Sequence, residues 1–224
     1  MFTVRRVALG VVCALVGLSV GVGGAGAREL PAPPSPFAAG GGDVTTMARE
    51  LATFSAAGND VSLLPHTPFQ ILYVGQGTGS FTMTPDGGLE AEGGNTFTVP
   101  RGQRFFAPVF FVDDSPPVLG TFPSSYLGGL GYFFAPDQIG GRDFAVTIDG
   151  HRYPLGPLYL SRPVTTPPLG DGGGTHFLLL GAFLAALAPG THTIAVSGGV
   201  FGALVKATGI SYEHEDLTYT VTVK

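Results

Sequence analysis

The sequence is poor in the residues on which several protein classes depend. Its 224 residues include one cysteine, no tryptophan and only 12% charged residues. The single cysteine, Cys13, can form no disulfide within the chain and lies in an apolar run near the N-terminus. Lys and Arg number 11 against 16 Asp and Glu, so the sequence lacks the clustered positive charge that nucleic acids and anionic membrane surfaces require. We therefore expect no disulfide scaffold, no thiol chemistry and no nucleic-acid partner.

The N-terminus has the pattern of a secretory signal peptide. Arg5 and Arg6 precede an apolar run over residues 7–22, and small residues follow as far as Ala25-Gly26-Ala27. A basic start, a short apolar run and an A-x-A site are typical of such a signal, with cleavage after Ala27. The run is shorter and richer in Gly than a membrane span of about 20 apolar residues. These features predict a secreted or periplasmic protein with no stable membrane insertion after cleavage.

The rest of the chain has the size of one domain. Removal of 27 of the 224 residues leaves 197, enough for a single domain with a substantial core. Loss of Arg5 and Arg6 changes the formal net charge from −5 to −7. Residues 28–43 are rich in Pro, Gly and Ala, which predicts a flexible, extended leader. We expect residues 44–224 to form a single β-sandwich domain.

In two segments near the C-terminus, large or apolar side chains alternate with small or polar ones, as in half-buried strands. Residues 191–197 place their larger side chains on even positions, and residues 217–224 place apolar groups on odd positions with Thr or Lys between them. Because side chains alternate faces along a strand, each segment would have one buried and one solvated face. The Pro189-Gly190 pair just before the first segment favours a tight turn.

The remaining patterns are also those of strands separated by Gly- and Pro-rich turns. Residues 176–187 form a continuous apolar run that we interpret as a strand with a bend at Gly181, although a helix is the alternative. Pro108 interrupts another apolar run and implies a bulge or an edge position there. We predict an all-β fold, an antiparallel β-sandwich of immunoglobulin-like or jelly-roll-like type with one short N-terminal helix. The other strand candidates are residues 69–74, 80–84, 95–99, 105–112 and 144–148.

The expected helix begins at Thr45 or Thr46 and extends to about residue 55. Met47, Leu51 and Phe54 would then lie on one helical face, as in a helix packed on the edge or end of a sandwich. By contrast, residues 113–141 have no clear period and predict the longest irregular stretch of the domain. Loops of this length in compact domains are often functional or mobile.

Several segments, taken in order, resemble known extracellular proteins. They are residues 98–102 (TVPRG), 105–109 (FFAPV), 148–150 (IDG), 187–194 (LAPGTHTI) and 217–223. This order is similar to that in a group of uncharacterised secreted bacterial proteins. The last two segments also resemble the terminal strands of immunoglobulin-like and PKD-like extracellular modules. The resemblance implies a β-sandwich and no catalytic residue.

The long irregular stretch contains the best candidates for a ligand site. Phe122, Tyr126, Tyr132 and Phe133 lie there among glycines. Exposed aromatic rings on a rigid scaffold can stack on sugars or bind a protein. The alternative, which we favour, is that these rings fold back and cover the open end of the sandwich.

Asp113 and Asp114 are the candidates for a metal site. They directly follow the apolar segment 105–112, and Asp137 and Asp149 lie in other predicted loops. Carboxylates at strand ends can bind Ca²⁺ through their oxygens. However, no D-x-D-x-D-G loop is present, and turn capping explains Asp113 and Asp149 equally well. We therefore expect no cofactor, with Ca²⁺ at Asp113 and Asp114 as the alternative.

Two further groups bear on catalysis. His192 lies on the same strand face as Ile194 and Val196, where a structural histidine bonded to a turn is favoured over a catalytic base. Residues 213–216 (EHED) are the densest polar cluster, which we interpret as a solvated turn before the last strand rather than an acid–base site.

Together these patterns favour a secreted, non-enzymatic binding, adhesive or structural module. Its partner would be an extracellular protein or a glycan. The alternative is a secreted hydrolase or metal-dependent enzyme with a carboxylate–histidine site. The two hypotheses differ in geometry, because an enzyme would place two carboxylates, or a carboxylate and a His, together inside a concave pocket.

Overall fold

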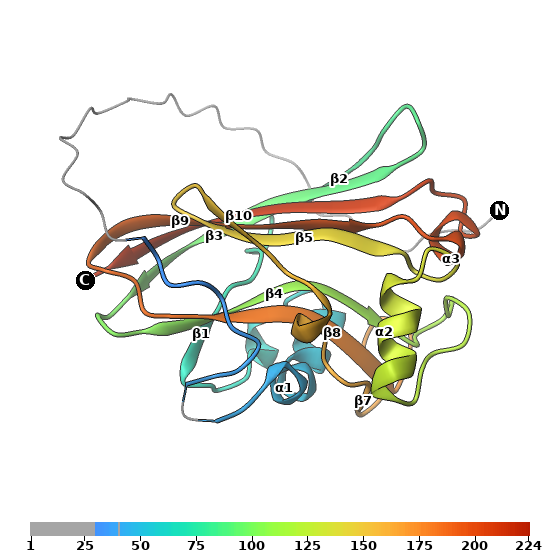
Figure 1. Ribbon diagram of the computed structural model, residues 1–224, viewed down its shortest axis with the longest axis horizontal. Coiled ribbons are helices and arrows are strands. Elements are labelled where there is room, and N and C mark those ends of the chain that lie inside the picture. Colours follow the sequence, from blue (N-terminus) through green and yellow to red (C-terminus); the bar gives the residue numbers. More distant parts are fainter. Residues whose placement is uncertain (1–29, 40) are drawn as a thin grey trace.

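The computed structural model describes residues 30–39 and 41–224 (Figure 1). The predicted signal peptide, residues 1–27, lies outside the described residues. Within them, no helix combines the length and apolar character needed to cross a bilayer.

The described chain folds into two β-sheets that face each other, which confirms the predicted all-β sandwich (Figure 1). The four-stranded sheet has the order β1-β4-β8-β7, formed by β1 (Phe69–Ile71), β4 (Arg104–Asp113), β8 (His176–Leu184) and β7 (Val164–Thr165). The six-stranded sheet has the order β2-β3-β10-β9-β5-β6, formed by β2 (Ser80–Met83), β3 (Leu89–Val99), β10 (Glu213–Val223), β9 (Gly190–Val200), β5 (Gly141–Ile148) and β6 (His151–Pro154).

Both sheets are mixed, so most strand pairs are antiparallel as predicted but two are not. The pairs β1–β4 and β3–β10 are parallel, while β9 and β10 are antiparallel as expected. The last strand inserts between β9 and β3 instead of adding at an edge. The alternation of apolar and polar side chains along a strand indicates which face is buried. It does not indicate which other strand will pair with it.

The predicted alternation of β9 and β10 is confirmed in the core. Ile194 and Val196 of β9 and Tyr219 and Val221 of β10 point inward and are buried. They meet β4 side chains from the opposite sheet, such as Phe105, in one apolar cluster. The outward positions are occupied largely by threonines, which favour strands and tolerate solvent. These outward threonines are Thr96, Thr98, Thr191, Thr193, Thr218, Thr220 and Thr222.

The predicted bulge at Pro108 is confirmed. Pro108 lies opposite Gly181 of β8, and the register shifts between Pro108 and Phe110. A bulge lets an interior strand accommodate a residue that has no backbone N–H. Gly181 is also required sterically, because a Cβ there would lie 2.7 Å from the Phe106 ring and 3.0 Å from the Ala107 carbonyl oxygen.

The N-terminal helix, α1 (Val44–Ala56), covers the outer face of the four-stranded sheet. Its buried Leu51 and Phe54 pack in a second apolar cluster with Phe177 and Phe183 of β8. The N-cap is Asp43 and not the predicted Thr45 or Thr46, because the Asp43 carboxylate accepts the Thr46 N–H at 2.9 Å. Three shorter elements are η1 (Val61–Leu63), η2 (Pro157–Tyr159) and α3 (Ala203–Lys206).

The predicted irregular stretch 113–141 contains a helix, α2 (Tyr126–Phe134). Its N-cap is Ser125, whose hydroxyl accepts the Gly128 N–H at 3.1 Å. Glycines at 128, 129 and 131 each disfavour a helix by about 1 kcal/mol, which is why the sequence favours a loop. Burial of Tyr132 and Phe133 against the sandwich outweighs that cost, so the helix forms only in its tertiary context.

Residues 30–39 lie against the protein and hydrogen bond to it, although their composition predicts a flexible leader. Ser35 pairs with Phe183 of β8, and Pro31 and Pro34 accept hydrogen bonds from tyrosine hydroxyls. These contacts come from residues more than 100 positions away, so they leave no local signal in the sequence.

Candidate functional site

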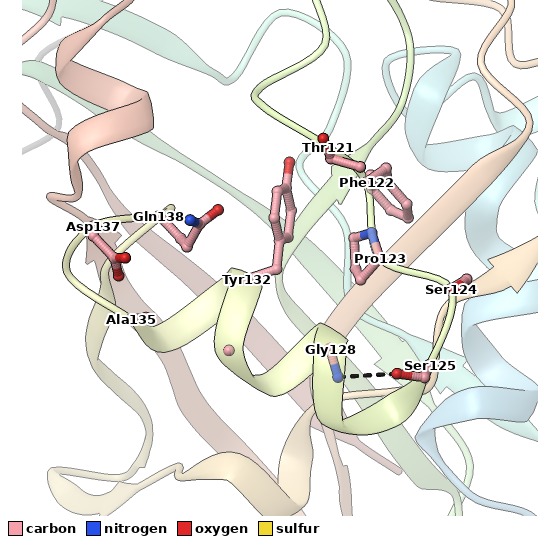
Figure 2. A pocket seen from close by; sticks show the side chains of 11 residues that line it. Thr121, Phe122, Pro123, Ser124, Ser125, Gly128, Tyr132, Ala135, Asp137 and Gln138 are labelled. Carbon is pink, nitrogen blue, oxygen red and sulfur yellow. Dashed lines mark hydrogen bonds between the residues drawn. The ribbon is translucent and has the colours of Figure 1, made fainter.

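A hollow of about 570 Å³ lies at the end of the sandwich beside α2 (Figure 2). One side is the 121–125 segment and the other is the turn that follows the helix. Figure 2 shows Tyr132 between these two sides. The lining residues are Thr121, Phe122, Pro123, Ser124, Ser125, Gly128, Gly131, Tyr132, Ala135, Asp137 and Gln138.

Two aromatic rings form the apolar wall of the hollow. The centroids of Phe122 and Tyr132 lie 5.6 Å apart, with the rings tilted by 56°. The Tyr132 hydroxyl donates to the Leu119 carbonyl at 2.8 Å. Burial, with the nearby charges of Asp113 and Asp114, raises the pKa of Tyr132 to about 12. The hydroxyl therefore stays protonated and the ring is held in one orientation.

The rim of the hollow supplies hydrogen-bonding groups. Asp137 and Gln138 follow α2 on one side, and Thr121 and Ser124 lie on the other (Figure 2). Asp137 and Ser124 are exposed, and Gln138 is half-buried. Ser125 is engaged in capping the helix. The arrangement combines an aromatic wall with amide, hydroxyl and carboxylate groups, which suits a polar, uncharged ligand.

Only two of the four aromatic residues predicted as ligand-site candidates line the hollow. Phe122 and Tyr132 line the hollow, but Tyr126 does not, and the Arg162 guanidinium lies 5.4 Å from its ring centroid. Phe133 is fully buried and packs against Phe144 in the core. We therefore correct the candidate set by removing Phe133, since no ligand can reach it in this conformation.

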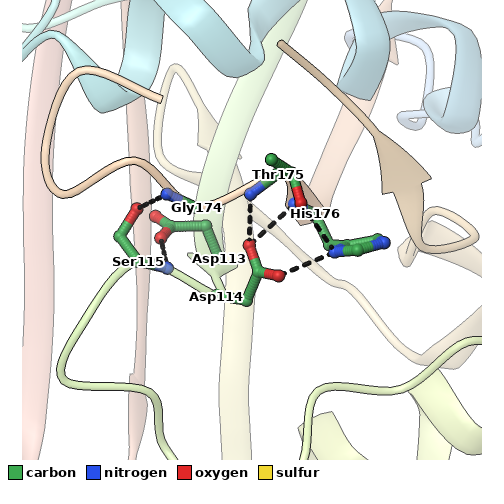
Figure 3. Close-up of polar contacts among 6 residues, drawn as sticks. All are labelled: Asp113, Asp114, Ser115, Gly174, Thr175 and His176. Carbon is green, nitrogen blue, oxygen red and sulfur yellow. Dashed lines mark hydrogen bonds and ion pairs between the residues drawn. The ribbon is translucent and has the colours of Figure 1, made fainter. Parts of the chain in front are cut away.

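Asp114 joins the ends of β4 and β8 (Figure 3). One carboxylate oxygen accepts the backbone N–H groups of Thr175 at 2.6 Å and His176 at 2.7 Å. The other lies 2.7 Å from His176 Nδ1. Burial alone would raise the pKa of Asp114, but the hydrogen bonds from His176 and Thr175 outweigh it and hold the pKa below its usual value.

Asp113 points to a different set of partners. Its carboxylate accepts the Ser115 N–H at 2.7 Å (Figure 3). The Ser115 hydroxyl in turn donates to Asp171 at 2.6 Å and accepts the Gly174 N–H at 3.1 Å. Burial raises the pKa of Asp113, and the neighbouring Asp171 acts in the same direction. Asp113 thus serves as a turn cap, which was the alternative to a Ca²⁺ site, and Asp114 joins two strand ends.

The acids considered for Ca²⁺ do not come together. Asp149 lies in the β5–β6 turn, at the opposite end of the sandwich from the α2 end, where Asp113 lies (Figure 1). Asp137 lies on the rim of the hollow. Among the described residues, no group of three or more His, Cys, Asp or Glu side chains could hold a metal ion.

Carboxylate–histidine pairs occur at two other places. His192 is 3% exposed, with Nδ1 2.7 Å from an Asp149 oxygen and Nε2 2.8 Å from the Ala188 carbonyl. Both ring nitrogens are therefore engaged in holding two turns together. On the outer face of the six-stranded sheet, His214 lies 3.2 Å from Glu90 and 3.4 Å from Asp216. Residues 213–216 are the start of β10 and not the predicted turn.

The Asp114–His176 pair does not have the geometry of a catalytic triad. A triad places the carboxylate on one imidazole nitrogen and the nucleophile on the other. Here Asp114 and the Thr175 hydroxyl, at 3.3 Å, are both beside Nδ1. His176 was not singled out from the sequence. The sequence could have indicated this pair only through Asp114 after one predicted strand and Thr175-His176 at the start of another. That signal is weak unless the pairing of β4 with β8 is known.

The chain matches no known protein family, no curated protein and no solved structure. The assignment of a function therefore depends on the geometry of the described residues.

We expect Asp114→Asn to lower the free energy of unfolding at pH 7 by about 1–2 kcal/mol, because an amide oxygen accepts weaker hydrogen bonds than a carboxylate. Folding lowers the pKa of Asp114. Its contribution is therefore complete above the unfolded pKa of about 3.9 and is lost as the pH falls through the folded pKa. The difference between wild type and variant should shrink below about pH 4, as measured by urea denaturation across the acid range.

The matched control is Asp143→Asn, since the Asp143 side chain is 73% exposed. It should change stability by less than about 0.5 kcal/mol at either pH. A destabilisation by Asp114→Asn that stays constant from neutral to acid pH would contradict the role of the charged carboxylate.

Proposed function

We propose that this protein is a secreted, non-enzymatic β-sandwich module that binds a neutral glycan in the hollow beside α2. The supporting observation is the pairing of the Phe122 and Tyr132 rings behind a rim of hydroxyl, amide and carboxylate groups. Loops at one end of a rigid sandwich are a common position for binding sites. The protein would then be an immunoglobulin-like extracellular module, similar to the uncharacterised secreted bacterial proteins that its sequence resembles.

The chemistry of the lining favours a glycan over an extracellular protein. The hollow, of about 570 Å³, has room for a sugar unit and is open to solvent, so a longer glycan could extend out of it. Of the residues that the structure describes, no Lys or Arg lines the hollow, and Asp137 is the single carboxylate there. Sugar rings present C–H faces that can stack on the half-buried Phe122 ring, which the 5% exposed Tyr132 supports from behind. Sugar hydroxyls can hydrogen bond to groups such as Gln138 and Ser124.

The positions of the carboxylate–histidine pairs favour binding over hydrolysis. Asp114 and His176, Asp149 and His192, and Glu90 and His214 all lie outside the lining of the hollow. The hydrolase alternative would require one of these pairs to face a bound substrate.

The test is a glycan array followed by calorimetry on the best neutral ligand. We expect Gln138→Ala to weaken its affinity about tenfold, since the buried ligand hydroxyl loses a hydrogen-bond partner. Gln76→Ala is the matched control, because Gln76 is exposed on a distant loop and should leave affinity unchanged.

Equal affinities for wild type and Gln138→Ala, or the absence of any glycan ligand from the array, would reject the hollow as a glycan site. Release of new reducing ends from the bound glycan would instead support the hydrolase. That reaction should then be lost in Asp114→Asn if the Asp114–His176 pair carries it.

A further inference from the structure

The segment Pro31-Ala32-Pro33-Pro34-Ser35-Pro36 can adopt little except an extended conformation. Proline fixes its own φ, and a residue that precedes proline is restricted to the extended and polyproline II regions. Every residue in this segment is a proline or precedes one. The segment therefore loses little conformational entropy when it binds a surface, which is the property that proline-rich ligands exploit.

Two tyrosine hydroxyls bind this segment with a three-residue spacing. Tyr153 donates to the Pro31 carbonyl at 2.6 Å, and Tyr159 donates to the Pro34 carbonyl at 2.9 Å. A polyproline II helix has three residues per turn, so carbonyls three residues apart point to the same side. The burial follows the same period, because Pro34 is buried and Pro31 half-buried while the two residues between them are exposed.

The next residue adds a strand-like contact. Ser35 and Phe183 exchange two backbone hydrogen bonds, of 2.9 and 2.8 Å. β7 pairs with this edge of β8 at residues 176 and 177, and Leu160 pairs with Leu180. Ser35 pairs with Phe183 at the part of the edge that follows. Tyr153 belongs to the six-stranded sheet and Phe183 to the four-stranded sheet. The segment, blue in Figure 1, thus joins the edges of the two sheets.

We infer that Tyr153, Tyr159 and the edge of β8 at Phe183 form a recognition groove for the proline-rich leader. We further infer that a second copy of this chain can supply that leader. The groove already binds residues 31–35 of its own chain, and every contact in it would be the same for the leader of another copy. Gly41 and Gly42, with φ of +100° and +103°, form the tight turn that joins the leader to α1, across which Phe37 pairs with Asp43. Exchange of an identical segment between copies is a low-cost route to a dimer.

The first experiment places a protease site between Gly41 and Gly42 of the chain comprising residues 28–224, and cuts it after folding. We expect the leader fragment to stay bound. A fluorescent synthetic peptide of residues 28–39 should then exchange into the cut protein, as followed by anisotropy. Tyr153→Phe with Tyr159→Phe should weaken peptide affinity about tenfold, because two hydroxyl donors are lost.

A peptide of the same composition with shifted prolines is the control, since it breaks the three-residue spacing, and it should not compete. Failure of the leader peptide to bind the cut, folded protein would overturn the inference. Equal binding of an unrelated proline-rich peptide would show a general proline-rich site and overturn the pairing between copies.

The second experiment uses the uncut chain and remains decisive if cutting unfolds the protein. Deletion of Gly41 and Gly42 removes the turn between the leader and α1 and should prevent the leader from folding back onto its own groove. We expect this variant to form a dimer with twice the monomer mass by light scattering. The two Tyr→Phe changes in the same background should return it to the monomer. A deletion variant that is monomeric at all concentrations would reject leader exchange. The groove is separate from the hollow beside α2, so the two proposals fail independently.

Discussion

Phe133→Ala is expected to lower the free energy of unfolding by about 3–5 kcal/mol, the usual cost of removing a fully buried phenylalanine. Phe133 has no exposed surface, and its ring centroid lies 5.5 Å from that of Phe144 and 6.1 Å from that of Phe110. It attaches α2 to the core shared by the two sheets. Urea denaturation followed by circular dichroism measures the loss.

The matched control lies on the same helix. Leu127 is 78% exposed, so Leu127→Ala should change stability by less than about 0.5 kcal/mol. If Phe133→Ala unfolded at the same urea concentration as wild type, α2 would be a mobile loop and the hollow beside it would have no fixed wall. The Gln138 binding test would then lose its structural basis.

His192→Ala should lower the free energy of unfolding by about 2–4 kcal/mol, because it removes a buried side chain and leaves two acceptors, one of them largely buried, without their imidazole partner. These acceptors are the Asp149 carboxylate, 16% exposed, and the Ala188 carbonyl. Asp149 also accepts the Thr193 N–H at 3.0 Å, so the β5–β6 turn and the turn before β9 share one network. Thermal and urea denaturation report the change.

His151→Ala is the appropriate comparison, because His151 is exposed and adjoins the same turn. It should be nearly neutral. A catalytic role for His192 predicts a different result, namely a stable variant that loses an activity. Comparable stabilities for the two alanine variants would therefore argue against the structural role given to His192.

The sequence predicted local structure well wherever the signal is periodic. The alternation in residues 191–197 and 217–223, the apolar face of α1, and the bulge at Pro108 all hold in the structure. Each depends on geometry that repeats along a few consecutive residues. The glycine-rich helix α2 was missed for the same reason, since its local propensity opposes the conformation that burial imposes.

The candidate site was only partly predictable. Phe122 and Tyr132 were among the aromatic candidates and do line the hollow, but nothing local separates them from Phe133, which the fold buries. Asp113 and Asp114 were correctly recognised as residues at a strand end. The turn cap of Asp113 is local, since its carboxylate accepts the Ser115 N–H, but the role of Asp114 depends on Thr175 and His176, which lie far away in the sequence.

By itself, the sequence determined that this chain builds strands with one buried face, turns at its Gly and Pro pairs and a helix from Thr45 or Thr46 to about residue 55. These features follow from side-chain periodicity and backbone restriction. Only the tertiary structure decided the order of the sheets, their two parallel pairings, the burial of Phe133 and the docking of the leader. Those features depend on contacts between residues distant in the chain, and no local pattern records which distant surfaces will meet.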